Sequence, residues 1–149
     1  MITWVRTGVG KESQPLRFLP EHALHLTVFV ILSLASGSLL SLALGAVLMN
    51  YMSYYVGSLL GIAETPSVVL LAGWPPWAIL RVVSFVVLGV ALSGPVLSRT
   101  AGVPFQWRSQ RVWIFLAGGG LLLDALLKTI LAPRWSVLLR SALFPLTGF

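Results

Sequence analysis

The chain has 149 residues, of which 57% are hydrophobic and only 9% are charged, and it contains no cysteine. About a quarter of the residues in a water-soluble domain are charged, because they cover its surface. A chain with so few charges is typical of a protein surrounded by lipid, where apolar side chains face a hydrocarbon solvent. The lack of cysteine excludes disulfides and thiolate metal sites, and the length allows a single compact domain.

The net charge of +6 does not by itself indicate a nucleic-acid partner. A nucleic-acid-binding surface gathers Lys and Arg on one face of a soluble domain. Here the basic residues lie mostly at the ends of apolar runs, where they act as topology signals and contact anionic headgroups. We therefore expect the lipid bilayer, and no nucleic acid, among the partners.

Residues 1–22 form a polar tail in which glycines and prolines interrupt any helix. Residues 23–49 carry no charge, and this run exceeds the roughly 20 residues that cross a bilayer core. The run is also longer than the roughly 7–15 apolar residues of a cleaved secretory signal. The pattern predicts a first transmembrane helix over 23–49 that is retained as an anchor.

The uncharged stretch continues to Ala63, which is too long for one simple crossing. Tyr51 and Tyr54 indicate where the membrane interface lies, because amphipathic rings favour headgroup depth. Gly57 then loosens the helix. We expect residues 57–73 to lie in the interface or to form a re-entrant segment.

Two further apolar runs follow the proline pair at positions 75 and 76. They predict transmembrane helices over 77–97 and 112–131, the latter stopping at Pro133. In the last segment, 135–149, apolar residues recur at helical spacing while arginines and serines occupy other faces. This segment is too short to span comfortably, so we expect an amphipathic helix that lies in the interface or docks on a neighbour.

Together these elements predict an all-α integral membrane protein. It has about three transmembrane helices and a short C-terminal helix that is amphipathic or partly inserted. The polar tail precedes a single transmembrane helical domain over 23–149.

The basic residues also predict an orientation. The tail carries three Lys or Arg, the loop 98–111 carries three, and the segment 50–76 carries none. By the positive-inside rule, the N-terminus and this loop lie on the cytoplasmic side of a bacterial plasma membrane or a thylakoid-type membrane. Three crossings then place the C-terminus on the opposite side, which Arg134 and Arg140 disfavour. A fourth, incomplete crossing by the last segment removes this conflict, so both arrangements remain open.

Small side chains recur every four residues along the first predicted helix, at Ser33, Gly37, Ser41 and Gly45. In lipid, such a stripe lets another helix approach closely and gain dispersion contacts and hydroxyl hydrogen bonds. Gly89 and Ser93 form a shorter version on the second predicted helix. The stripes either pack the helices of this chain on one another or receive a helix from another protein.

Three charged residues fall inside the predicted spans: Arg81, Asp124 and Lys128. A charge at the bilayer centre costs about 2.5–3.5 kcal/mol on insertion scales, so it needs a partner or a function. Asp124 and Lys128 are four residues apart and can pair on one helix face. Arg81 lies about one turn from Trp77 and can extend to the headgroups. The alternative interpretation is a polar pathway through a transporter.

The chain offers little for catalysis or metal binding. His22 and His25 lie on one side of the first helix, but two ligands without a neighbouring carboxylate cluster make a weak metal site. The sequence lacks the common hydrolase and phosphate-binding motifs. We therefore predict no catalytic residue, no metal and no cofactor, and leave a bound lipid or pigment open.

These observations favour a small non-catalytic membrane subunit or assembly factor of a larger membrane protein complex. It would act through helix–helix packing at the small-residue stripes. Its partners would be other membrane proteins or further copies of the chain. The alternative is a transporter or channel component with a polar pathway around Arg81, Asp124 and Lys128.

Overall fold

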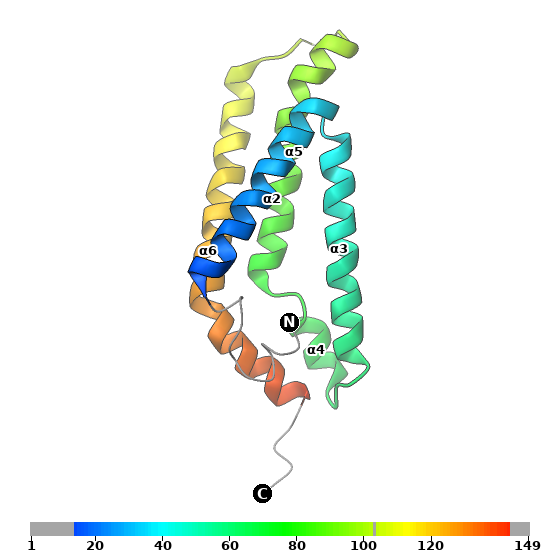
Figure 1. Ribbon diagram of the computed structural model, residues 1–149, viewed down its shortest axis with the longest axis vertical. Helices are drawn as coiled ribbons and strands as arrows, with labels where there is room; N and C mark the ends of the chain where they lie inside the picture. Colours follow the sequence, from blue (N-terminus) through cyan, green and yellow to red (C-terminus); the bar gives the residue numbers. More distant parts are fainter. Residues whose placement is uncertain (1–13, 103, 144–149) are drawn as a thin grey trace, which may run out of the picture.

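The computed structural model describes residues 14–102 and 104–143, and every regular element within them is an α-helix. The helices are α2 (Pro15–Ser36), α3 (Leu39–Leu60), α4 (Pro66–Ala72), α5 (Pro76–Thr100) and α6 (Trp107–Leu143). The four long helices alternate in direction along the long axis, and the short α4 lies at one end (Figure 1). All four are long and apolar enough to cross a membrane. The all-α class is confirmed, with four such helices rather than about three.

The single helix predicted over 23–49 is wrong, because the chain reverses direction at Gly37 and Ser38. Both residues have left-handed backbone conformations, with φ of 60° and 72°. The Ser38 amide donates to the carbonyl oxygen of Ser33 at 2.9 Å, which closes the end of α2. Glycine adopts this conformation without a Cβ penalty, so the turn costs little at Gly37. The uncharged sequence hides the turn because both flanking helices are equally apolar.

Helix α2 begins at Pro15, within the tail that was predicted to be irregular. Proline is well accommodated in the first turn of a helix, where its missing N–H has no intrahelical partner to lose. Pro20 lies inside the same helix. Leu16 and Leu19 are exposed, so the apolar outer surface begins seven residues earlier than the 23–49 boundary.

Helix α6 continues through Pro133, where the predicted third span was expected to stop. An internal proline removes one backbone hydrogen bond and bends a helix without necessarily ending it. The end of α6 turns towards α4 (Figure 1). Trp135 Nε1 donates to the carbonyl oxygen of Ala72 at 2.7 Å, and Thr65 Oγ1 donates to that of Ala142 at 3.0 Å. The predicted C-terminal helix is therefore the docked end of α6 up to residue 143, and residues 144–149 lie outside the described part.

The segment 57–73 comprises the end of α3, a turn and the seven-residue helix α4. A Cβ atom at Gly73 would lie 2.9 Å from Val56 Cγ1, so only glycine allows α4 to end this close to α3. The interfacial or re-entrant position of this segment stays a prediction.

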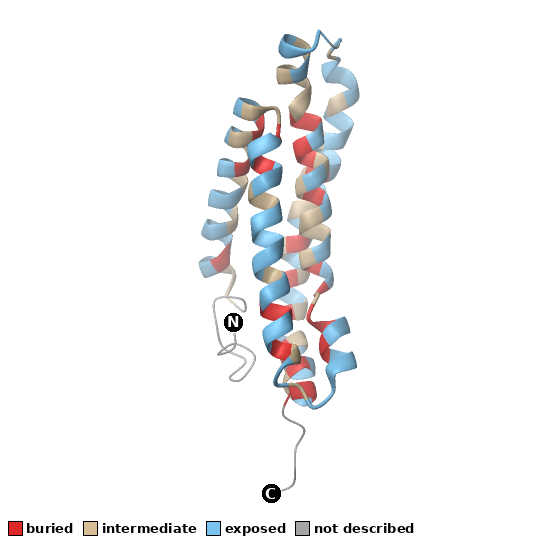
Figure 2. Ribbon diagram, turned by 90° about the vertical axis from the view of Figure 1, so that its right-hand side faces the viewer, coloured by how far each residue is buried: buried red, intermediate tan, exposed pale blue. Residues whose placement is uncertain are grey.

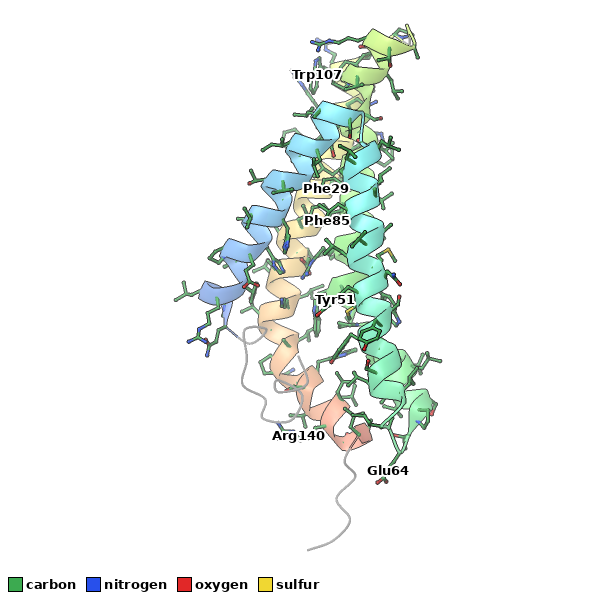
Figure 3. The ribbon with its side chains drawn as sticks, turned by 45° about the vertical axis from the view of Figure 1, so that its right-hand side comes forward. Phe29, Tyr51, Glu64, Phe85, Trp107 and Arg140 are labelled. Carbon is green, nitrogen blue, oxygen red and sulfur yellow. The ribbon has the colours of Figure 1, made fainter. Side chains whose placement is uncertain are left out.

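Two apolar clusters hold the helices together. The larger joins the ends of α3 and α6 to α4 and the start of α5, around Leu59, Val69, Trp77 and Leu139. The smaller joins α2, α5 and α6 around Phe29, whose ring lies 4.7 Å from that of Phe85 (Figure 3). Buried residues line the inner sides of the helices, and the outer sides are exposed (Figure 2). That outer surface carries many large apolar side chains, as a lipid-facing surface does.

The alternation of the helices differs from the arrangement used in the predicted topology, whereas the orientation in the membrane stays a prediction. Helix α2 starts, and α6 ends, at the same end of the bundle, whereas the α5–α6 loop lies at the other end (Figure 1). The described part of the tail, from residue 14, and the α5–α6 loop therefore do not share an end. Arg140 and Trp107 mark the two ends of α6 (Figure 3). Arg134 and Arg140 now lie at the end where α2 begins, so the conflict over their placement disappears.

Candidate functional site

A buried ion pair joins the middle of α6 to the second turn of α5. Arg81 Nε donates to Asp124 Oδ2 at 2.8 Å, and Arg81 Nη2 donates to Asp124 Oδ1 at 2.8 Å. The Asp124 side chain is 2% exposed and that of Arg81 is 27% exposed. Bidentate pairs of this kind are among the strongest hydrogen-bonded contacts. Asp124 is thus paired with a residue of another helix, whereas the pair predicted between Asp124 and Lys128 stays a prediction.

Helices α5 and α6 approach each other closely, which allows Arg81 to contact Asp124. A Cβ atom at Gly120 would overlap with Ser84 Oγ, one turn from the pair on both helices. The absence of a side chain at Gly120 brings the two backbones together. Interfaces in membrane helices use small residues for this purpose.

Lys128 lies one turn beyond Asp124 and faces α2. Its Nζ is 4.4 Å from the centroid of the Phe18 ring, and both side chains are buried. A cation over an aromatic face gains about 0.5–2 kcal/mol, with the larger values in desolvated sites. Phe18 also contacts the His22 ring, with centroids 5.3 Å apart. The chain of contacts from Lys128 through Phe18 to His22 connects α6 to α2.

His22 completes a group of four ionisable residues, which we call the charged cluster: His22, Arg81, Asp124 and Lys128. His22 lies close enough to Arg81 and Lys128 for both charges to act on it. Its Nε2 atom is buried and has no hydrogen-bond partner among the described residues. The sequence placed His22 at the membrane interface and did not connect it with the charges. The one available signal was its position one turn after Phe18, on the same face of α2.

The described residues contain no group of three His, Cys, Asp or Glu side chains that could hold a metal ion. His25, the other histidine of the sequence pair, is exposed on α2.

Most of the predicted small-residue stripe packs inside the bundle, at the α2–α3 turn. Ser33 Oγ donates to Ser41 Oγ at 2.8 Å, and Ser41 Oγ donates to the carbonyl oxygen of Ser38 at 3.0 Å. Ser38 Oγ donates to the carbonyl oxygen of Gly89 on α5. All three serines are buried, and their hydroxyls satisfy one another and the backbone. We call this group the serine turn.

Two glycines of the stripes contact neighbouring helices. A Cβ atom at Gly37 would lie 3.2 Å from Val96 Cγ1, and one at Gly89 would lie 3.3 Å from Phe29 Cζ. Ser93 donates to the carbonyl oxygen of Val90 on its own helix. Gly37 and Gly89 therefore belong to internal contacts between α2 and α5.

Other glycines face outwards. Added Cβ atoms at Gly45 on α3 and at Gly118 and Gly119 on α6 would meet no atom within 4 Å. Gly119 is flanked on the surface by large exposed side chains: Phe115, Leu116, Leu122 and Leu123. We call Gly118 and Gly119 with these four flanking residues the glycine notch.

No protein-family model, curated protein or solved structure matches this chain.

Proposed function

We propose that the chain is a small non-catalytic subunit or assembly factor of a larger membrane protein complex. Its four long helices cross the bilayer, and the glycine notch on α6 receives a transmembrane helix of another membrane protein. The observation that carries this proposal is the notch itself, where glycines lie between bulky apolar side chains on the outside of the bundle.

Small residues on an outer helix face favour close helix–helix contact in lipid. Association there depends on packing and on close backbone approach, because lipid tails are as apolar as the helices. Gly119 leaves a gap between the exposed side chains of Phe115 and Leu123 on one face of α6, and such a gap can receive a side-chain ridge of a partner helix. Most of the small-residue stripe predicted on the first helix packs inside the bundle, at the serine turn. The outer face of α6 is therefore the favoured docking face in place of that stripe.

Orientation follows from the basic residues at the two ends of the bundle. Four crossings place the sequence before α2 and the end of α6 on one side of the membrane. That side has five Lys or Arg outside the charged cluster: Arg6, Lys11, Arg17, Arg134 and Arg140. The other side has three: Arg99, Arg108 and Arg111. The excess favours a cytoplasmic N-terminus in a bacterial plasma membrane or thylakoid-type membrane.

Replacing Gly119 by Leu tests the docking face. The variant fills the notch, and its Cβ atom meets no atom of this chain within 4 Å, so it should fold normally and lose its partner. Gly45→Leu is the matched control, because it also adds an outward side chain in open space but on α3. Co-purification from the native membrane, analysed by native mass spectrometry, reports the partner. Equal recovery of the complex with both variants contradicts the docking proposal, and loss of a homo-oligomer alone identifies the partner as another copy.

A second candidate function rests on the charged cluster. Arg81, Asp124 and Lys128 lie together among otherwise apolar helices, and the Arg81 side chain is partly exposed. Such groups line ion and proton pathways in transporters. In proteoliposomes, Asp124→Asn should abolish flux while the protein remains folded if the cluster transports a charge. If the pair is structural, the same variant loses stability, and exchanging Arg81 and Asp124 restores part of it.

A further inference from the structure

Two nitrogen groups of the charged cluster can still form hydrogen bonds. Arg81 uses Nε and Nη2 for Asp124, and its Nη1 donates to no residue in the described part of the chain. His22 Nε2 is buried without a partner among the same residues. A buried polar atom without a hydrogen bond is costly and uncommon in native proteins, which indicates a missing water, ion or ligand group.

The surroundings of these two groups favour an anion. Each carboxylate oxygen of Asp124 accepts one hydrogen bond from Arg81, and this pairing fixes the guanidinium plane with its Nη1 edge directed away from the carboxylate. Lys128 adds a second positive charge beside Phe18 and close to His22. Glu21, the neighbour of His22, is exposed. Guanidinium, imidazole and ammonium groups are the side chains that commonly bind phosphate.

We propose that the charged cluster binds a phosphate group, with His22 Nε2 and Arg81 Nη1 donating hydrogen bonds to its oxygens. Lys128 stabilises the negative charge electrostatically. The phosphate comes either from the headgroup of an anionic lipid or from inorganic phosphate in solution. This site is separate from the glycine notch and does not depend on the docking proposal.

The position of the cluster in the bundle suits a lipid headgroup. Arg81 lies five residues after α5 begins at Pro76, and Phe18 lies three residues after α2 begins at Pro15. Both helices begin in the half of the molecule that contains α4, above α4 in the view of Figure 1. At about 1.5 Å of rise per residue, Arg81 lies roughly 8 Å from the start of α5, and His22 lies roughly 10 Å from the start of α2. A phosphate at the membrane interface can reach this depth while its acyl chains lie along the apolar outer surface.

Native mass spectrometry of the full chain in a neutral maltoside detergent tests the site. The probes are short-chain phosphatidylglycerol, inorganic phosphate, and a diacylglycerol with the same chains and no phosphate. We expect one phosphatidylglycerol per protein and weaker binding of the diacylglycerol. His22→Phe keeps the ring contact with Phe18 but removes the donor. It should weaken phosphatidylglycerol binding about tenfold, the effect of one hydrogen bond to a charged group.

His25→Phe is the matched control, because it makes the same change at an exposed site on the same helix and should leave binding unchanged. Arg81→Lys is a second variant, which keeps a cation for Asp124 while removing Nη1. It reports on the site if His22→Phe does not fold. Displacement of the lipid by inorganic phosphate identifies free phosphate as a ligand, and lipid binding without displacement identifies the headgroup. Equal binding of diacylglycerol, no binding of either phosphate probe, or unchanged binding by both site variants overturns the proposal.

Discussion

The serine turn and the charged cluster both place polar groups inside an apolar helical bundle, but they do so differently. In the serine turn, Ser33, Ser38 and Ser41 donate to one another or to the backbone. In the charged cluster, Arg81 and Asp124 form a bidentate pair, whereas His22 Nε2 has no partner among the described residues. Polar groups that satisfy one another serve packing, whereas an incompletely satisfied group points to a ligand. The difference separates a structural polar site from a candidate binding site.

The largest expected effect comes from breaking the ion pair. Asp124→Ala leaves the Arg81 guanidinium partly buried without its carboxylate, and removing one partner of a buried pair costs about 3–5 kcal/mol. Thermal unfolding in detergent should show a strongly lowered midpoint. Exchange of the two residues, with Asp at 81 and Arg at 124, should recover part of the loss. An unchanged midpoint for Asp124→Ala would show that the pair contributes no stability.

A smaller effect is expected from the helix contact that supports the pair. Gly120→Ala introduces a methyl group that overlaps with Ser84 Oγ, and overpacking of this kind typically costs about 1–3 kcal/mol. Gly118→Ala is the control on the same helix, because its added Cβ meets open space. The two variants should therefore differ in thermal midpoint. Equal midpoints would contradict the close approach of α5 and α6.

The smallest effect is expected at the serine turn. Ser41→Ala removes the acceptor for Ser33 Oγ and the donor for the Ser38 carbonyl, without leaving any charge unpaired. Hydrogen bonds between membrane helices average about 0.6 kcal/mol, so the midpoint should fall only slightly. A loss as large as that of Asp124→Ala would remove the proposed distinction between the two polar regions.

The helical class could be predicted from the sequence because long apolar runs are a direct signal of membrane helices. The sequence did not predict the reversal at Gly37 and Ser38, because hydropathy does not change there and the four-residue spacing of small side chains continues across the turn. Pro133 led to the opposite error, since a helix supported by docking against α4 continues past a proline.

Only part of the charged cluster could be predicted from the sequence. Arg81, Asp124 and Lys128 stand out as charges in apolar surroundings, but local spacing favoured the Asp124–Lys128 pair. The partner of Asp124 depends on the register between two antiparallel helices, which Gly120 and Ser84 set through their contact. His22 belongs to a third helix, and its place in the cluster depends on how α2 packs.

The central claim is that four helices cross the membrane, so that the ends of α6 lie on opposite sides. The chain has no cysteine, which allows single-cysteine labelling without background. Ser109→Cys and Ser141→Cys place thiols at exposed positions near the two ends of α6. A membrane-impermeant maleimide applied to intact cells should label Ser109→Cys, and should label Ser141→Cys only after lysis. Labelling of both positions from the same side would contradict the crossing of α6 and the four-helix arrangement.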